Sequence, residues 1–185
     1  MRFWSVCVIL SLGLGVLHAQ DSGAGGDWEA EFFTIDGFRI AHYRFPTPEQ
    51  AEGGVTLNVA QLRDLLAEED KILLVDVQPV LFRHGRFILS EAHHAIPGSR
   101  WLPNVGHGDL LPEWQNYLSA FLAEHTRDHP DRPMVFYCTA NCWMSWNTVK
   151  RVAEMGFRRL YWFREGIEAW QEAGEPTEVI LPEPR

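Results

Sequence analysis

Three short apolar runs, each followed by a segment with helical spacing, constrain the fold of this chain more than any other feature. The runs are Lys71–Val77, Pro133–Cys138 and Arg159–Phe163. Continuous apolar runs of this length are typical of strands that are buried on both faces, as in parallel sheets. Helical spacing predicts helices after Asn58 and over residues 112–125, 143–155 and 166–173. The alternation predicts an α/β domain with a mainly parallel central sheet flanked by helices.

Weaker patterns surround these elements. Residues 28–45 alternate loosely around an Asp36-Gly37 turn, which predicts a hairpin or two extended pieces, Glu31–Ile35 and Phe38–Tyr43. Thr56-Leu57 is expected to introduce the first helix, and residues 80–94 are expected to be polar and irregular.

The first residues have the pattern of an export signal. Arg2 is followed by an apolar run without charge, Phe3–Leu17, and Ala19 supplies a small residue for cleavage. We expect a cleavable signal peptide over 1–19, the alternative being an uncleaved membrane anchor. The remaining boundaries are predicted as an N-terminal tail and extended segment over 20–53, one domain over 54–178, and a C-terminal tail over 179–185.

The charge balance and the cysteines narrow the function. The chain of 185 residues has 16 basic and 25 acidic side chains, and loss of residues 1–19 removes only Arg2 from this balance, leaving a net charge of −10. An acidic surface disfavours nucleic acid and, after cleavage, membranes as partners.

Cleavage also removes Cys7, so that Cys138 and Cys142 remain. A disulfide between residues so close together would constrain little of the unfolded chain, so a purely structural role explains the pair poorly. A chemical or metal-binding role is favoured instead.

Cys138 has the setting of a nucleophile. It ends an apparent strand, and a helix begins about five residues later, at Trp143. Unpaired N–H groups and the positive end of the helix favour a thiolate over a thiol. We therefore expect the backbone of Thr139, Ala140, Asn141 and Trp143 to cradle an anionic sulfur on Cys138.

At these residues the chain resembles the rhodanese-like family. Val135-Phe136-Tyr137-Cys138 before a helix is similar to the family's active-site strand and loop. Three further motifs follow its order of landmarks: Leu74-Val75-Asp76-Val77, Ile96-Pro97-Gly98-Ser99, and Glu165-Gly166-Ile167-Glu168-Ala169-Trp170 with Gly174-Glu175-Pro176. The resemblance spans residues 54–178 and implies a sulfurtransferase of rhodanese type acting through Cys138.

A narrower family is also similar, the one named for PQQ-dependent catabolism and a Cys…Cys-Trp motif. The similarity rests on residues 37–44, 101–106, 138–147 and 161–162, including Cys138, Cys142 and Trp143. It implies a bacterial periplasmic protein that accompanies quinoprotein alcohol-dehydrogenase systems, with a quinoprotein dehydrogenase or a cytochrome as its partner.

The loop departs from its relatives in charge. Asn141 and Trp143 stand where a sulfurtransferase of this family usually has a glycine and then a basic residue, and Met144 stands where a phosphatase of this fold needs arginine. Without a basic residue the loop would bind a phosphate dianion poorly, which excludes the phosphatase and weakens the case for thiosulfate. Three arginines of the long loop between the first two predicted strands could supply the missing cation, against the alternative of solvated surface residues: Arg83, Arg86 and Arg100.

Cys142 has two possible roles. It either attacks a persulfide or mixed disulfide on Cys138 and leaves an intramolecular disulfide, or it packs beneath the loop as a small apolar residue. The leading hypothesis is a sulfur-handling enzyme that uses a small sulfur donor or thiol acceptor and no cofactor. The alternative is a non-catalytic accessory or Cu(I)/thiol-redox module for quinoprotein dehydrogenase systems. Such a module would either bind Cu(I) through Cys138, Cys142 and a loop histidine, or dock on the dehydrogenase or its cytochrome. The candidate histidines are His84, His93, His94 and His107.

Two other groups lie near the motif. Asp76 ends a neighbouring strand, and it either orients the loop or accepts hydrogen bonds from nearby backbone donors. Trp143 is expected to cap the sulfur, and Trp146 and Trp162 to fill the core.

Overall fold

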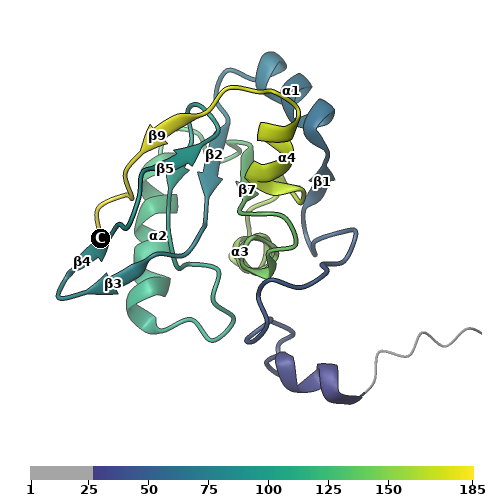
Figure 1. The fold of residues 1–185 in the computed structure, drawn as a ribbon, viewed down its shortest axis with the longest axis vertical. Helices are drawn as coiled ribbons and strands as arrows, with labels where there is room; N and C mark the ends of the chain where they lie inside the picture. The colour runs from purple at the N-terminus through teal and green to yellow at the C-terminus, as the bar shows by residue number, and fades with distance from the viewer. Residues whose placement is uncertain (1–26) are drawn as a thin grey trace, which may run out of the picture.

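The computed structural model describes residues 27–185, with side chains placed from residue 30 onward. Within this part of the chain, a five-stranded sheet forms the centre, in the order β1-β8-β7-β2-β6. Figure 1 labels β1, β7 and β2 of this sheet. All of its strand pairs are parallel. The strands are β1 (Val55–Leu57), β2 (Leu73–Asp76), β6 (Arg100–Trp101), β7 (Met134–Tyr137) and β8 (Leu160–Phe163).

Helices cover both faces of this sheet. The helices are α1 (Val59–Glu68), α2 (Pro112–Thr126), α3 (Trp143–Glu154) and α4 (Gly166–Glu172). Alternate strand residues point to opposite faces: in β2, Leu73 and Val75 pack with the core of α2 and α3, whereas Leu74 packs with α1 and α4. Because both faces are buried, the strands read as continuous apolar runs. The predicted α/β architecture is confirmed.

The start of α1 shows how the sequence sets one helix boundary. Asn58 accepts a hydrogen bond from the Gln61 N–H, and the Gln61 side chain accepts one from the Asn58 N–H, which is a capping box. The residues just before this cap were expected only to introduce the helix. They form β1 instead, and that prediction was wrong because pairing with β8 extends them as an edge strand.

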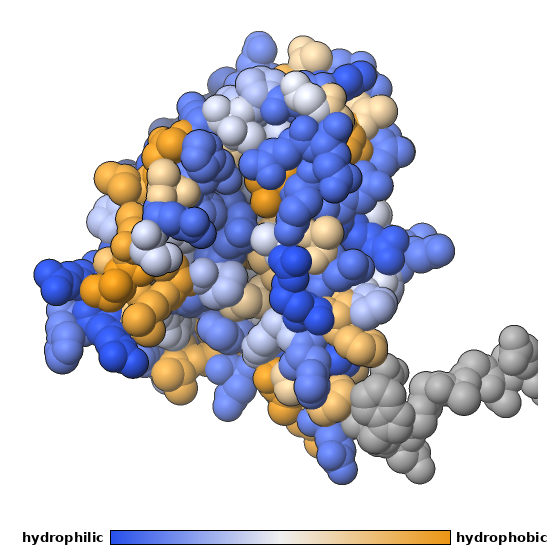
Figure 2. Space-filling model, in the orientation of Figure 1, coloured by the Kyte–Doolittle hydropathy of each residue, from blue (hydrophilic) through white to orange (hydrophobic). Residues whose placement is uncertain are grey.

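Residues 80–94, predicted as irregular, contain three short strands. β3 (Leu81–Arg83) and β4 (Arg86–Ile88) form a hairpin, and β5 (His93–Ala95) pairs with β9 (Glu178–Ile180). The prediction failed because these strands pair outside the central sheet and are not buried on both faces. Figure 2 shows apolar side chains gathered around the hairpin, where Leu81 and Ile88 are exposed.

The two ends of the described chain also pack on the domain. The expected extended piece Glu31–Ile35 is helical over its first residues, because a 3₁₀ helix covers Asp27–Phe32. Of the predicted hairpin, the structure has one antiparallel bridge, between Phe33 and Arg39. At the other end, β9 pairs with β5, and the Glu183 N–H donates to the Trp101 carbonyl.

The predicted signal peptide, residues 1–19, lies outside the described residues. Among the helices from residue 27 onward, none combines the length and apolar character needed to span a membrane.

Candidate functional site

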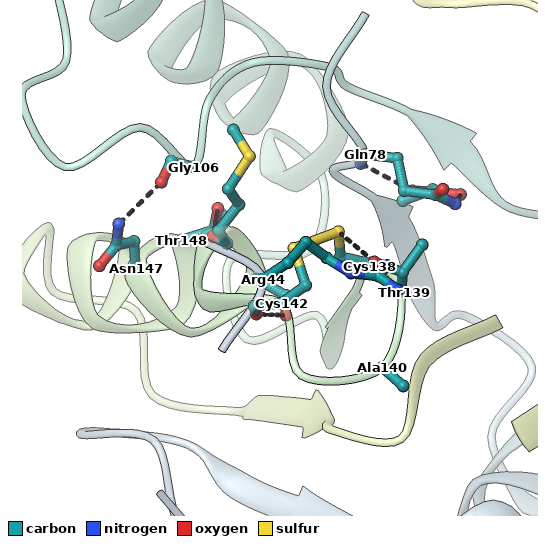
Figure 3. The surroundings of a disulfide bond; sticks show 12 residues. Arg44, Gln78, Gly106, Cys138, Thr139, Ala140, Cys142, Asn147 and Thr148 are labelled. Carbon is teal, nitrogen blue, oxygen red and sulfur yellow. Dashed lines mark hydrogen bonds between the residues drawn. A yellow bond between two sulfur atoms is a disulfide. The ribbon is translucent and has the colours of Figure 1, made fainter. Parts of the chain in front are cut away.

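The two cysteines occupy the turn between a central strand and the helix that follows it. β7 ends at Tyr137, Cys138 comes next, and Cys142 is the N-cap residue of α3. A disulfide joins Cys138 to Cys142, with 6.1 Å between their Cα atoms (Figure 3). The segment between them, residues 138–142, is the cysteine loop below. Its shape requires a left-handed conformation at Asn141, whose φ is 53°.

Both sulfur-bearing side chains are buried. Cys138 is 1% exposed and Cys142 is 3% exposed, and both belong to the core cluster of the α2 and α3 face. Cys142 packs beneath the loop and is bonded to Cys138, and its role as an attacking thiol stays a prediction. The core therefore closes the inner side of the loop.

A segment from the N-terminal region covers one side of the cysteine loop. We call residues 43–45 the strap. The Trp143 N–H donates to the Tyr43 carbonyl at 2.8 Å, and the Phe45 N–H donates to the Asn141 carbonyl at 3.0 Å. Arg44 and Cys142 form an antiparallel bridge between these bonds (Figure 3). The strap therefore holds the loop by backbone pairing, as a short strand would.

Helix α4 holds the other side of the loop. The Ile167 N–H donates to the Cys138 carbonyl at 3.0 Å, and the Ala140 N–H donates to Glu168 Oε2 at 2.8 Å. Gly166 makes this approach possible, since a Cβ at its position would lie 2.5 Å from the carbonyl carbon of Thr139. Glu168 was not predicted as a site residue, although it lies inside the Glu-Gly-Ile-Glu motif.

The N–H groups expected to cradle a sulfur anion are partly engaged when the disulfide is closed. Those of Ala140 and Trp143 donate to Glu168 and Tyr43. The Thr139 hydroxyl lies 3.7 Å from Cys138 Sγ. The disulfide form therefore binds its own chain with two of the donors that an anionic sulfur would use.

The tryptophans near the loop have different surroundings. Trp162 is 1% exposed and donates from Nε1 to Ser145 Oγ, which confirms its place in the core. Trp146 packs against the same core from a partly buried position. The Trp143 ring contacts Trp146 and the guanidinium of Arg39, which lies 5.0 Å from the ring centroid. Trp143 thus anchors the N-terminal segment to the start of α3.

Asp76 lies at the end of β2, beside Tyr137 in the sheet register. Its carboxylate is fully buried and accepts hydrogen bonds from the Gln78 N–H at 2.8 Å, Gln78 Nε2 at 3.0 Å and His93 Nε2 at 2.9 Å. The His93 ring stacks on Trp101 with 3.6 Å between centroids. These bonds agree with the interpretation of Asp76 as an acceptor for nearby donors.

Tyr137 joins this network from β7. Its hydroxyl accepts from the Ile96 N–H and pairs with Ser99 Oγ at 2.8 Å. Burial, together with the negative charge of Asp76, raises the pKa of Tyr137 well above its ordinary value. The hydroxyl therefore stays protonated and fixes the Ile96–Ser99 turn.

The other predicted histidines and arginines lie apart from the cysteine loop. His84 occupies the turn of the β3–β4 hairpin and His94 lies in β5, while His107 packs against Tyr43, and burial followed by the charge of Arg151 lowers its pKa. Arg83 and Arg86 belong to the hairpin, and Arg100 pairs with Glu183. All three arginines are exposed, which agrees with the alternative of solvated surface residues. Within residues 27–185, His, Cys, Asp and Glu side chains form no group of three that could hold a metal ion, so a third Cu(I) ligand is not gathered at the cysteines.

Comparison with known proteins identifies the frame around this loop. Residues 58–173 match the family model described as the rhodanese-like domain. The chain belongs to the rhodanese-like family. Its five-stranded parallel sheet flanked by helices is the rhodanese fold.

Solved structures of this fold are distant in sequence. Thiosulfate sulfurtransferase from Pseudomonas aeruginosa superposes with a TM-score of 0.50 at 17% identity, over 70% of this chain and 21% of its own. The polysulfide-sulfur transferase homodimer from Wolinella succinogenes gives a TM-score of 0.44 at 20% identity, over 68% of this chain and 79% of its own. This chain thus spans about a fifth of the first structure, and the likeness concerns the fold alone. No curated protein sequence matches the chain.

Two arginines near the cysteine loop contact acceptors of this chain. Arg44 comes from the strap, which lies outside residues 58–173, and its guanidinium pairs with Glu168 Oε1 at 3.4 Å. Arg164, at the end of β8, donates to the hydroxyl and the carbonyl of Thr47. The guanidinium groups of Arg44 and Arg164 therefore both contact acceptors of this chain.

Proposed function

We propose that this rhodanese-like protein handles sulfane sulfur, with Cys138 as the accepting nucleophile and Cys142 as the resolving thiol. The observation that carries the proposal is the Cys138–Cys142 disulfide in the loop between β7 and α3. A second cysteine within bonding reach of the first gives a persulfide on Cys138 an intramolecular route of release.

The proposed cycle starts from the dithiol form. The Cys138 thiolate attacks the outer sulfur of a persulfide donor, R–S–SH, so that a new S–S bond forms on Cys138 and R–S⁻ leaves. The Cys142 thiolate then attacks Sγ of Cys138, and HS⁻ leaves as the disulfide closes. The sulfane sulfur gains two electrons, and the two cysteine thiols lose them. A dithiol reductant restores the starting form by exchange with the disulfide.

The surroundings of the loop suit this chemistry. Cys142 caps α3, a helix of 12 residues, so both sulfurs lie at its positive end. That end favours the thiolate and persulfide anions over their neutral forms. The buried position of both sulfurs would limit loss of the persulfide to bulk solvent.

We further propose that the protein works in the periplasm, beside a quinoprotein alcohol dehydrogenase or its cytochrome. The export pattern over residues 1–19 and the Cys…Cys-Trp motif at Cys138, Cys142 and Trp143 support this proposal. The acidic balance of the chain suits a protein partner with a basic surface.

A second candidate function is thiol–disulfide exchange without transferred sulfur, as an accessory to the same system. The disulfide favours it equally, because a reversible Cys138–Cys142 bond is sufficient for such a role. The two functions differ in one observable, which is whether an extra sulfur atom is ever carried on Cys138.

Intact mass measurement after anaerobic incubation with a small organic persulfide tests the proposal. Reduced Cys142→Ser should gain the mass of one sulfur atom, because its persulfide has no resolving thiol, whereas wild type should release sulfide and return to the disulfide. Cys138→Ser, which keeps Cys142, is the matched control and should gain nothing. No added sulfur on Cys142→Ser, or equal addition on Cys138→Ser, would contradict the sulfur-handling function and leave the exchange function.

A further inference from the structure

Glu168 makes two contacts at the mouth of the cysteine loop. Oε2 accepts from the Ala140 N–H at 2.8 Å, and Oε1 pairs with Arg44 Nη1 at 3.4 Å. The two donors come from different parts of the chain, the loop itself and the strap. One carboxylate therefore joins both of the segments that border the disulfide.

A loop N–H and a guanidinium side by side are the donors that proteins use to bind small oxyanions. Here the chain's own carboxylate contacts both of them. An incoming anion would have to displace Glu168 or approach against its charge. Glu168 thus fills the place that a bound anionic donor would otherwise take beside the loop.

The space outside the loop has the same sign of charge. A cavity of about 310 Å³ opens beside Ala140 and Asn141, and three carboxylates of α4 or its N-cap line it. Arg164 also lines this cavity, but Thr47 holds its guanidinium through two hydrogen bonds. These lining carboxylates are Glu165, Glu168 and Glu172.

We propose that Glu168 is a specificity-determining residue that makes the Cys138–Cys142 centre select against anionic sulfur reagents and for neutral or cationic ones. The inference rests on the proposed function in so far as the disulfide is the reacting group. It assigns a substrate class to that centre: thiols and sulfur donors without a negative group beside the reacting sulfur. Glu168 acts through its charge and through its hold on the Ala140 N–H and Arg44.

The test uses the simplest reaction of the disulfide, its reduction by small thiols. A thiolate R–S⁻ attacks one cysteine sulfur, and the other cysteine leaves as a thiolate. A second R–S⁻ then attacks the mixed disulfide, giving R–S–S–R and the dithiol protein. The probes are cysteamine, 2-mercaptoethanol and 2-mercaptoethanesulfonate, which carry a positive, a neutral and a negative group. Rates are measured by intact mass and are compared per thiolate.

Glu168→Gln is the informative variant, because glutamine keeps an acceptor for the Ala140 N–H and loses the charge. In wild type we expect the rate to fall from cysteamine to 2-mercaptoethanesulfonate. In Glu168→Gln the ratio of these two rates should fall by roughly five- to tenfold, because one unit charge acts with opposite sign on the two charged thiols in a largely aqueous setting. The anionic thiol should gain more than the neutral one.

Two further variants separate this effect from a general change of charge. Glu172→Gln removes the same charge from the same cavity lining, and we expect less than half of the effect there. Adding Arg44→Gln to Glu168→Gln should remove most of the gain of the anionic thiol, because the freed guanidinium attracts it. An unchanged cysteamine ratio in Glu168→Gln, an equal shift in Glu172→Gln, or equal acceleration of neutral and anionic thiols would overturn the inference.

This test and that of the proposed function fail separately. Reduction by plain thiols requires no persulfide, so charge selection can be present in a protein that never carries sulfur on Cys138. In the same way, sulfur loading of Cys142→Ser can be present in a protein without charge selection.

Discussion

Two neighbouring strands of this sheet end side by side, and their ends are fixed in different ways. β2 ends at Asp76, and β7 ends at its register partner Tyr137, just before Cys138. At the β2 end, a buried carboxylate holds its loop by three hydrogen bonds. At the β7 end, the disulfide closes a loop that the strap and α4 hold from two sides.

The two strand ends differ in how they respond to a change of redox state. Reduction breaks the covalent bond between Cys138 and Cys142, while the hydrogen bonds around Asp76 contain no group that reacts with a thiol. We therefore expect the Asp76 network to keep the strand ends in place while the cysteine loop changes its covalent state. Four predictions test this division, in order of decreasing effect.

Removing the Asp76 carboxylate should have the largest effect on stability. Asp76→Ala leaves the Gln78 N–H and the His93 side chain without their acceptor in a buried site, and we expect a loss of about 3–5 kcal/mol in the free energy of unfolding. Urea unfolding measures it, with Asp64→Ala on the exposed side of α1 as the control, expected to change stability by no more than about 0.5 kcal/mol. A loss below about 1 kcal/mol for Asp76→Ala would remove the distinction between the two strand ends.

Placing a methyl group at Gly166 should push α4 away from the cysteine loop. Its φ of 69° and the 2.5 Å approach to the Thr139 backbone together predict a loss of about 3 kcal/mol for Gly166→Ala. Gly174→Ala is a matched control, since its φ is also positive, at 77°, but nothing lies within 4 Å of the added Cβ. We expect about 1 kcal/mol there, from backbone strain alone. Equal losses of unfolding free energy at the two glycines would show that the cysteine loop accommodates the added methyl group without an extra cost.

Reduction of the disulfide should cost less than either substitution. It joins residues only four apart, and loop-closure entropy for so small a ring predicts about 2 kcal/mol. Unfolding is compared with and without a dithiol reductant, and Cys142→Ser should show no response to it. A loss well above the predicted value in wild type would mean that the loop supports the sheet as strongly as Asp76 does.

The smallest expected effect concerns pH and the strap. Burial and the charge of Arg151 lower the pKa of His107 below 6.5, and its ring packs against Tyr43 of the strap with 5.4 Å between centroids. The unfolded chain then binds more protons than the folded one, so stability falls as the pH drops through and below 6.5. His107→Gln should flatten this fall in pH-dependent unfolding curves. Some dependence should remain, because the pKa of His125 is also lowered.

The sequence predicts the central part of this fold because burial on both faces leaves a local signature. β2, β7 and β8 lie inside the three apolar runs, and α1 begins beside its Asn58 cap. β1 carries no such signature, since it is a three-residue edge strand defined by its pairing with β8. The hairpin of β3 and β4 is equally short and lies outside the central sheet.

The sequence likewise predicts only part of the candidate site. Cys138 and its place before a helix follow from the local pattern of a strand, a turn and a helix. The contacts that surround it do not, because Tyr43 and Glu168 reach the loop from distant parts of the chain. The disulfide itself depends on how the loop folds back, which the spacing of two cysteines leaves open.

The central sheet and the contacts of the cysteine loop begin at different residues, because the strap precedes β1. A fragment beginning at residue 54 would keep every strand of the central sheet, since β1 begins at Val55. It would lose the segment that pairs with Asn141 and Trp143, and with it the guanidinium that faces Glu168. Such a fragment would keep the central sheet but would lack part of the surroundings of the cysteine loop. The contacts that hold the cysteine loop therefore begin upstream of the first strand of the central sheet.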